Sequence, residues 1–87
     1  MPQESCGIFR VGTRAQSLWP VLAEAARGAE YFLVEAAPSN RDLISVSGSL
    51  LGPGQRKLMP RDTVRRARMV APEEGQLEVF AVVEGGQ

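Results

Sequence analysis

Four short runs of β-branched and aromatic residues, each bounded by turn residues, constrain this chain most strongly. They cover residues 6–12, 30–37, 43–48 and 77–83. Such residues favour extended backbone, whereas Gly, Pro, Asn and Asp interrupt it. In the third run the apolar Ile44 and Val46 alternate with serines, which is typical of a strand with one face in water. The sequence therefore predicts four strands separated by turns.

A helix is predicted between the first two strands. Apolar residues recur at helical spacing from Ala15 to Ala26, and Gly28 follows where a glycine C-cap belongs. Pro20 is tolerated in the first turn of a helix but not in its interior. We therefore expect either a helix that starts at Ser17 or a kinked helix that starts at Thr13.

Residues 58–70 are compatible with two structures. As a helix, the segment has Pro60 at its first position, Asp62 in its first turn and arginines near its end, an order that suits the helix dipole. As a strand, residues 64–70 would pair with the final strand across the turn at residues 71–75. We favour the helix and keep the strand as the alternative.

The resulting order of elements is β-α-β-β-α-β. This is the order of the ferredoxin-like split βαβ arrangement, and we predict an α+β fold of that kind. If residues 58–70 form a strand, the alternative is one helix packed on a five-stranded, mainly antiparallel sheet. A chain of 87 residues is expected to form a single domain, residues 1–87, in which residues 84–87 are a flexible tail.

The composition limits the reactions that the protein could catalyse and the compartments in which we expect it. No histidine occurs, so a nucleophile would have no imidazole base. The only cysteine, Cys6, cannot complete a zinc site with carboxylates alone. We therefore expect no enzyme activity, no metal and no cofactor, with Cys6 as a structural residue and Glu73 and Glu74 as solvated loop acids. The chain shows no signal peptide and no apolar run long enough to cross a bilayer, so we expect a cytoplasmic protein without membrane contact.

A basic segment is the most informative functional feature. Residues 55–68 contain a single acid, Asp62, and six basic residues. We predict these six as the partner-binding site: Arg56, Lys57, Arg61, Arg65, Arg66 and Arg68. On a single helix, four of them would form one stripe, namely Lys57, Arg61, Arg65 and Arg68. Arginine suits bidentate contacts to carboxylates or phosphates, and the alternative is a solvated face.

Two classes of partner compete for this segment. The chain has ten basic and ten acidic residues and a sequence pI of 6.2, whereas nucleic-acid-binding domains are usually net basic. Aromatic residues for base stacking are few. We therefore predict a non-enzymatic binding, inhibitor or adaptor module that docks an acidic protein surface. Binding to nucleic acid phosphates is the first alternative, and a small oligomeric enzyme or ligand-binding domain is the second.

Self-association is a further expectation. A ferredoxin-like sheet often leaves one face open, and a homodimer would cover it if apolar strand residues reach that face. The candidate residues are Ile8, Val34, Ile44 and Val82.

Two further segments match functional motifs only in part. The segment Gly52-Pro53-Gly54-Gln55-Arg56-Lys57 lacks the phosphate-loop pattern, and Pro53 has no amide, so we expect a surface loop. The chain ends Glu84-Gly85-Gly86-Gln87. Its Gly-Gly-Gln resembles the end of the prokaryotic ubiquitin-like modifier, whose last glutamine is deamidated before ligation to lysine. That modifier is otherwise shorter, acidic and disordered, so a flexible terminus is expected here.

Overall fold

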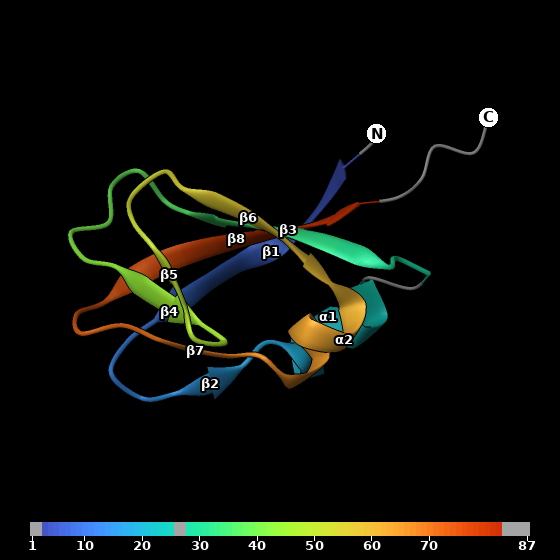
Figure 1. Ribbon diagram of the computed structural model, residues 1–87, viewed down its shortest axis with the longest axis horizontal. Helices are drawn as coiled ribbons and strands as arrows, with labels where there is room; N and C mark the ends of the chain where they lie inside the picture. Colours follow the sequence, from blue (N-terminus) through green and yellow to red (C-terminus); the bar gives the residue numbers. More distant parts are fainter. Residues whose placement is uncertain (1–2, 26–27, 83–87) are drawn as a thin grey trace.

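The computed structural model describes residues 3–25 and 28–82 of the chain (Figure 1). This part of the chain contains eight strands and two short helices. The strands are β1 (Gln3–Val11), β2 (Gln16–Ser17), β3 (Tyr31–Ala36), β4 (Ile44–Val46), β5 (Ser49–Leu51), β6 (Arg56–Pro60), β7 (Arg68–Val70) and β8 (Gly75–Val82). The helices are α1 (Trp19–Ala25) and α2 (Arg61–Arg66).

The strands form two antiparallel sheets. The long sheet has the strand order β1-β8-β3-β6, and the short sheet has the order β2-β7-β4-β5. Figure 1 shows the short sheet and both helices on the same side of the long sheet. The opposite side of the long sheet, which we call its outer face, has no layer of this chain on it among the described residues.

Burial alternates along the strands, as a pleated backbone requires. On β3, Phe32, Val34 and Ala36 are buried, whereas the residues between them are partly exposed. Leu77 and Val79 of β8 lie opposite Ala36 and Val34 and are buried with them. Burial of each of the larger side chains, such as Phe32 and Leu77, stabilises the fold by roughly 1.5–3 kcal/mol. No buried residue of the described chain is polar or charged, so apolar burial carries the core.

Helix α1 begins two residues later than Ser17. Gln16 and Ser17 instead form β2, where they pair with Met69 and Arg68 of β7. The carbonyl of Leu18 accepts the first helical hydrogen bonds, from the amides of Val21 and Leu22. Pro20 is thus in the first turn, as expected, and the kinked helix from Thr13 is wrong. The end of this predicted helix, residues 26–27, lies outside the described residues.

Residues 58–70 combine both of the predicted structures. They hold the end of β6, the short helix α2 and the strand β7. Pro60 precedes the helix with φ −66° and ψ 155°, and Asp62 and the arginines take the positions that the dipole favours. The strand part, β7, pairs with β2 and β4. The predicted pairing of this segment with the final strand is therefore wrong, because β8 is already flanked by β1 and β3.

The third predicted strand is shorter than expected. It ends at Val46, and a two-residue turn leads directly into β5, with Val46 opposite Ser49. Both turn residues have positive φ, 52° at Ser47 and 82° at Gly48. Positive φ at both positions defines the type I′ turn, whose twist matches that of the paired strands. Gly48 therefore belongs to the turn and not to the strand.

The fold class is confirmed at the level of α+β with mostly antiparallel strands. The ferredoxin-like arrangement and the five-stranded alternative are not confirmed, because the strands divide into two four-stranded sheets. The four short strands β2, β4, β5 and β7 form a second layer that the predicted order does not contain. Within the described residues, neither helix has the length and apolar character needed to cross a membrane.

Candidate functional site

The six predicted site residues lie on three different elements. Arg56 and Lys57 belong to β6, Arg61, Arg65 and Arg66 belong to α2, and Arg68 belongs to β7. The predicted stripe on a single helix is therefore wrong. Helix α2 has only six residues, because Pro60 precedes it and Ala67 returns to extended backbone with φ −68° and ψ 140°.

Arg61 contributes to the packing of the two helices. Its guanidinium carbon lies 5.4 Å from the centre of the Trp19 ring, and its Nη1 donates a hydrogen bond to the carbonyl of Ala29 at 3.4 Å. Its backbone amide also donates to the carbonyl of Glu30 at 2.8 Å. A cation over the face of an indole ring is attracted by the negative charge density of the ring. Arg61 thus holds α2 against α1, and its side chain has partners within the fold.

The two basic residues of β6 also have neighbours within the protein. Lys57 donates a hydrogen bond from Nζ to Oγ of Ser49 at 2.6 Å, which ties the edge of the long sheet to the edge strand β5 of the short sheet. Arg56 lies directly opposite Glu35 in the register of β6 and β3. Opposite charges in such cross-strand positions attract each other, so both residues contribute to the contact between elements.

The remaining three basic residues form what we call the arginine cluster: Arg65, Arg66 and Arg68. All three are exposed, and they lie within four consecutive positions where α2 passes into β7. Between them, Ala67 is buried and anchors the chain to the core. The positive charges of Arg65 and Arg66 are also favourable in the last turn of a helix. Arg56 and Lys57 of the predicted site are exposed as well, whereas Arg61 is partly buried. The arginine cluster is thus the larger of the two exposed groups of basic residues in the predicted site.

An open apolar groove, which sequence reasoning missed, lies on the outer side of the short sheet. It has a volume of about 450 Å³, and its apolar lining includes Leu43, Leu50, Val70 and Pro72. Leu50 is 62% exposed and Leu43 is 46% exposed. The only sequence signal was the alternation around Ser45, which predicted a solvent-facing side but not that leucines from neighbouring segments would gather on it.

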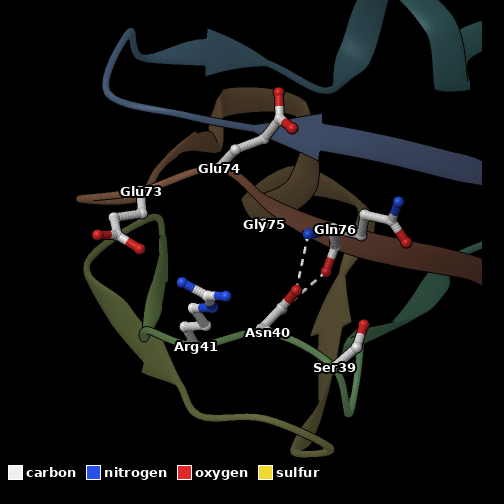
Figure 2. A pocket seen from close by; sticks show the side chains of 7 residues that line it. All are labelled: Ser39, Asn40, Arg41, Glu73, Glu74, Gly75 and Gln76. Atoms are coloured by element: carbon white, nitrogen blue, oxygen red, sulfur yellow. Dashed lines mark hydrogen bonds between the residues drawn. The ribbon is translucent and has the colours of Figure 1, made fainter.

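A second, polar hollow of about 310 Å³ lies at the start of β8 (Figure 2). Its centre is Asn40, whose Oδ1 accepts a hydrogen bond from the Gln76 amide at 2.9 Å. The Nδ2 of Asn40 donates a hydrogen bond to the carbonyl of Gln76 at 3.0 Å. Figure 2 shows the side chain of Arg41 beside this contact, with Glu73 and Glu74 around the same hollow. Both acids are exposed, as expected for loop residues.

The glycine-rich loop uses its own amides. The Gly52 amide donates to Oε1 of Gln55 at 2.6 Å, the Gln55 amide to the Gly52 carbonyl at 3.0 Å, and the Gly54 amide to the Ala36 carbonyl at 2.9 Å. Pro53 has no amide to donate. A phosphate cradle requires free amides that point at the ligand, so this segment is better described as a tight loop between β5 and β6.

Cys6 occupies a bulge in β1. Ser5 pairs with Phe80 and Gly7 pairs with Val79, which leaves Cys6 as the extra residue. Its side chain is partly buried. Burial raises the pKa of the Cys6 thiol above its ordinary value of 9.0; a backbone hydrogen bond with Ala81 opposes this, and the charge of Glu4 adds to it. The thiolate is therefore disfavoured at neutral pH, which argues against a nucleophilic role.

Three further sequence predictions concern a metal ion, a dimer face and the C-terminal tail. Within the residues that the structure describes, no group of three or more His, Cys, Asp or Glu side chains could hold a metal ion. Of the four residues proposed for a dimer face, Ile8 is 65% exposed, whereas Val34, Ile44 and Val82 are buried. The predicted Gly-Gly-Gln tail lies outside the described residues.

Comparison of the chain with protein-family models, with curated protein sequences and with solved structures gave no match.

Proposed function

We propose that this protein is a non-enzymatic binding module that docks an acidic protein surface through the arginine cluster. The observation that supports the proposal is the exposure of Arg65, Arg66 and Arg68 at one junction of the fold. Other basic residues of the segment are engaged within the protein, Arg61 with Trp19 and Lys57 with Ser49. Arginine forks match carboxylates in pairs of parallel hydrogen bonds.

The aromatic residues favour a protein partner over a single-stranded nucleic acid. Base stacking requires exposed rings. Phe32 is completely buried, Phe9 and Trp19 are packed against the core, and the Trp19 ring carries Arg61. Tyr31 is the aromatic residue among the exposed large side chains, at 45%. One exposed ring makes a poor stacking platform, and the chain has no excess of positive charge.

The test is fluorescence anisotropy with three labelled probes: a poly-glutamate peptide, double-stranded DNA and single-stranded RNA. Each is titrated with the protein at low and at physiological salt. We expect the peptide to bind and to weaken with salt. Changing Arg65, Arg66 and Arg68 together to Ala should weaken its binding about tenfold, since each exposed charge pair contributes up to about 1 kcal/mol.

A matched control changes three other exposed arginines to Ala, namely Arg10, Arg14 and Arg41. This variant loses the same charge and should bind the peptide nearly as well as the wild type. Equal losses in both variants would mean that only net charge matters and would reject the arginine cluster as the site. Tighter binding of DNA or RNA than of the peptide would replace the proposal with the nucleic-acid alternative.

A further inference from the structure

The apolar groove and Arg68 of the arginine cluster lie on the same side of the short sheet. Ser45 of β4 pairs with Leu50 of β5 on one side and with Val70 of β7 on the other. These three side chains therefore form one row across three strands, and all three line the groove. Arg68 precedes Val70 by two residues, so it lies on the same face, about 7 Å along the strand.

The two ends of the groove have opposite charge. Arg68 lies at one end, and Arg65 and Arg66 precede it in the chain at the end of α2. At the other end the exposed Glu73 and Glu74 follow the lining residue Pro72, and the exposed Asp42 precedes the lining residue Leu43. Arg41 lies near these acids (Figure 2) and offsets part of their charge. The groove thus has an apolar floor between a basic end and a more acidic end.

The charge pattern of the groove favours some classes of ligand over others. A nucleic acid would be attracted at the Arg68 end but repelled by Glu73, Glu74 and Asp42. A purely acidic peptide would leave Leu43 and Leu50 in contact with water, and a purely apolar peptide would not use the arginines. Burial of apolar side chains together with complementary charge is the combination that distinguishes a specific docking surface.

We propose that the groove binds an extended segment of a partner protein that carries both apolar and acidic side chains. The apolar side chains lie over Leu43, Leu50 and Val70, and the acidic side chains lie against the arginine cluster. The proposal deepens the function proposed above and rests on it. A volume of about 450 Å³ accommodates a few aliphatic side chains of such a segment.

The experiment uses three labelled hexapeptides on the full chain. The first joins three glutamates to Leu-Val-Leu and is made in two versions, with the glutamates at the N-terminal or at the C-terminal end. The second has glutamates only, and the third has lysines in place of the glutamates of the first. We expect the acidic–apolar peptide to bind about tenfold more tightly than the glutamate peptide, since burial of one or two aliphatic side chains is sufficient for such a gain.

Two leucines provide matched variants. Leu50→Asp places a carboxylate in the groove, and Leu58→Asp places one at a similarly exposed position of β6, on the outer face of the long sheet. Both residues are at least half exposed, at 62% and 50%, so both variants should fold, which circular dichroism checks. Leu50→Asp should abolish the tenfold advantage of the acidic–apolar peptide, whereas Leu58→Asp should preserve it. Leu50→Ala should reduce the advantage partly.

The outcomes separate this inference from the proposed function. If the two acidic peptides bind equally, the groove is not the docking surface, while the arginine cluster stands as the site. If neither acidic peptide binds, both proposals fail. A greater loss in Leu58→Asp than in Leu50→Asp, or tightest binding of the lysine peptide, would also overturn the groove.

Discussion

Asn40 illustrates how one polar side chain can take the place of a strand. Its amide group accepts from the amide of Gln76 and donates to the carbonyl of Gln76, as the backbone of a paired strand would. Gly75 beside it is buried, and a Cβ there would lie 3.3 Å from Oδ1 of Asn40. The absence of a side chain at Gly75 therefore allows Asn40 to approach β8 and hold the preceding loop.

We expect Asn40→Ala to lower the free energy of unfolding by about 1–2 kcal/mol, because it removes both hydrogen bonds to Gln76. Urea denaturation followed by circular dichroism measures the change. Asn40→Asp keeps the acceptor for the Gln76 amide but loses the donor, so its free energy of unfolding should lie between those of the wild type and Asn40→Ala. Ser39→Ala, at an exposed position of the same hollow, should change stability by less than about 0.5 kcal/mol. Equal effects of Asn40→Ala and Ser39→Ala would contradict this role.

Cys6 offers a pH-dependent prediction at the same scale. Because burial raises its pKa in the folded state, alkylation by iodoacetamide should rise with pH with a midpoint above 9.0. The sign for stability follows: the neutral thiol is favoured by folding, so this contribution is present below the unfolded-state pKa and is lost as the pH rises through the folded-state pKa. Mass spectrometry of the alkylated protein measures the rate, with Cys6→Ser as the unlabelled control. A midpoint below 9.0 would show that the thiolate is stabilised instead.

At the scale of the elements, the long strands could be predicted, whereas among the short ones only β4 was. The runs that became β1, β3 and β8 have six or more residues each, and their β-branched and aromatic residues are visible in the sequence. By contrast, β2 has two residues and β7 has three. Strands of that length show no period, and pairing with distant partners, such as Gln16 with Met69, determines them.

The same limit applies to the candidate site. The arginines were found because they are close together in the sequence, but their distribution over β6, α2 and β7 was not. The groove was missed because Leu43, Leu50 and Val70 come from three separate segments. Only the pairing of Ser45 with both Leu50 and Val70 brings them together, and that pairing is a property of the folded chain.

The contact between α1 and α2 can be measured as a coupling energy. A double-mutant cycle of Trp19→Leu and Arg61→Ala should give an interaction of about 0.5–1 kcal/mol, the usual range for a cation over an indole ring at a partly exposed position. The stability of the four proteins in urea provides the cycle. A second cycle that combines Trp19→Leu with Arg65→Ala is the control and should give no coupling, because Arg65 is an exposed position on the same helix. A coupling of the same size for Arg65 would mean that the ring contact is not its source.

The turn between β4 and β5 allows a prediction about the stability of two variants. Ser47 has a positive φ of 52°, which costs energy in a residue with a side chain but is better tolerated by Asn. Ser47→Asn should therefore stabilise the protein by about 0.5 kcal/mol, and Gly48→Ala should destabilise it by about 1 kcal/mol. Thermal unfolding compares them. Gly12→Ala, at a glycine without positive φ and with open space at its Cβ, is the control and should have little effect.

At the scale of the whole molecule, the outer face of the long sheet exposes apolar side chains beside charged ones such as Glu35, Glu78 and Arg56. Ile8, Tyr31 and Leu58 are all at least 45% exposed there, on three of its four strands. We expect a second copy of the chain to cover this face at high concentration. Light scattering should then give twice the mass of the 9.4 kDa chain. Ile8→Asp should restore the monomer and Leu50→Asp should not, whereas a wild-type monomer at every concentration would exclude the dimer.

The position of β8 between β1 and β3 has a consequence for synthesis on the ribosome. The two flanking strands do not pair with each other, since each uses β8 as its neighbour. The long sheet therefore cannot be completed while β8, the final strand described, is still inside the exit tunnel. Until then Phe32 and Val34 of β3 have β6 on one side but lack the strand on their other side. A chain with such long-range pairing is slow to fold, and its nascent form exposes apolar segments that chaperones recognise.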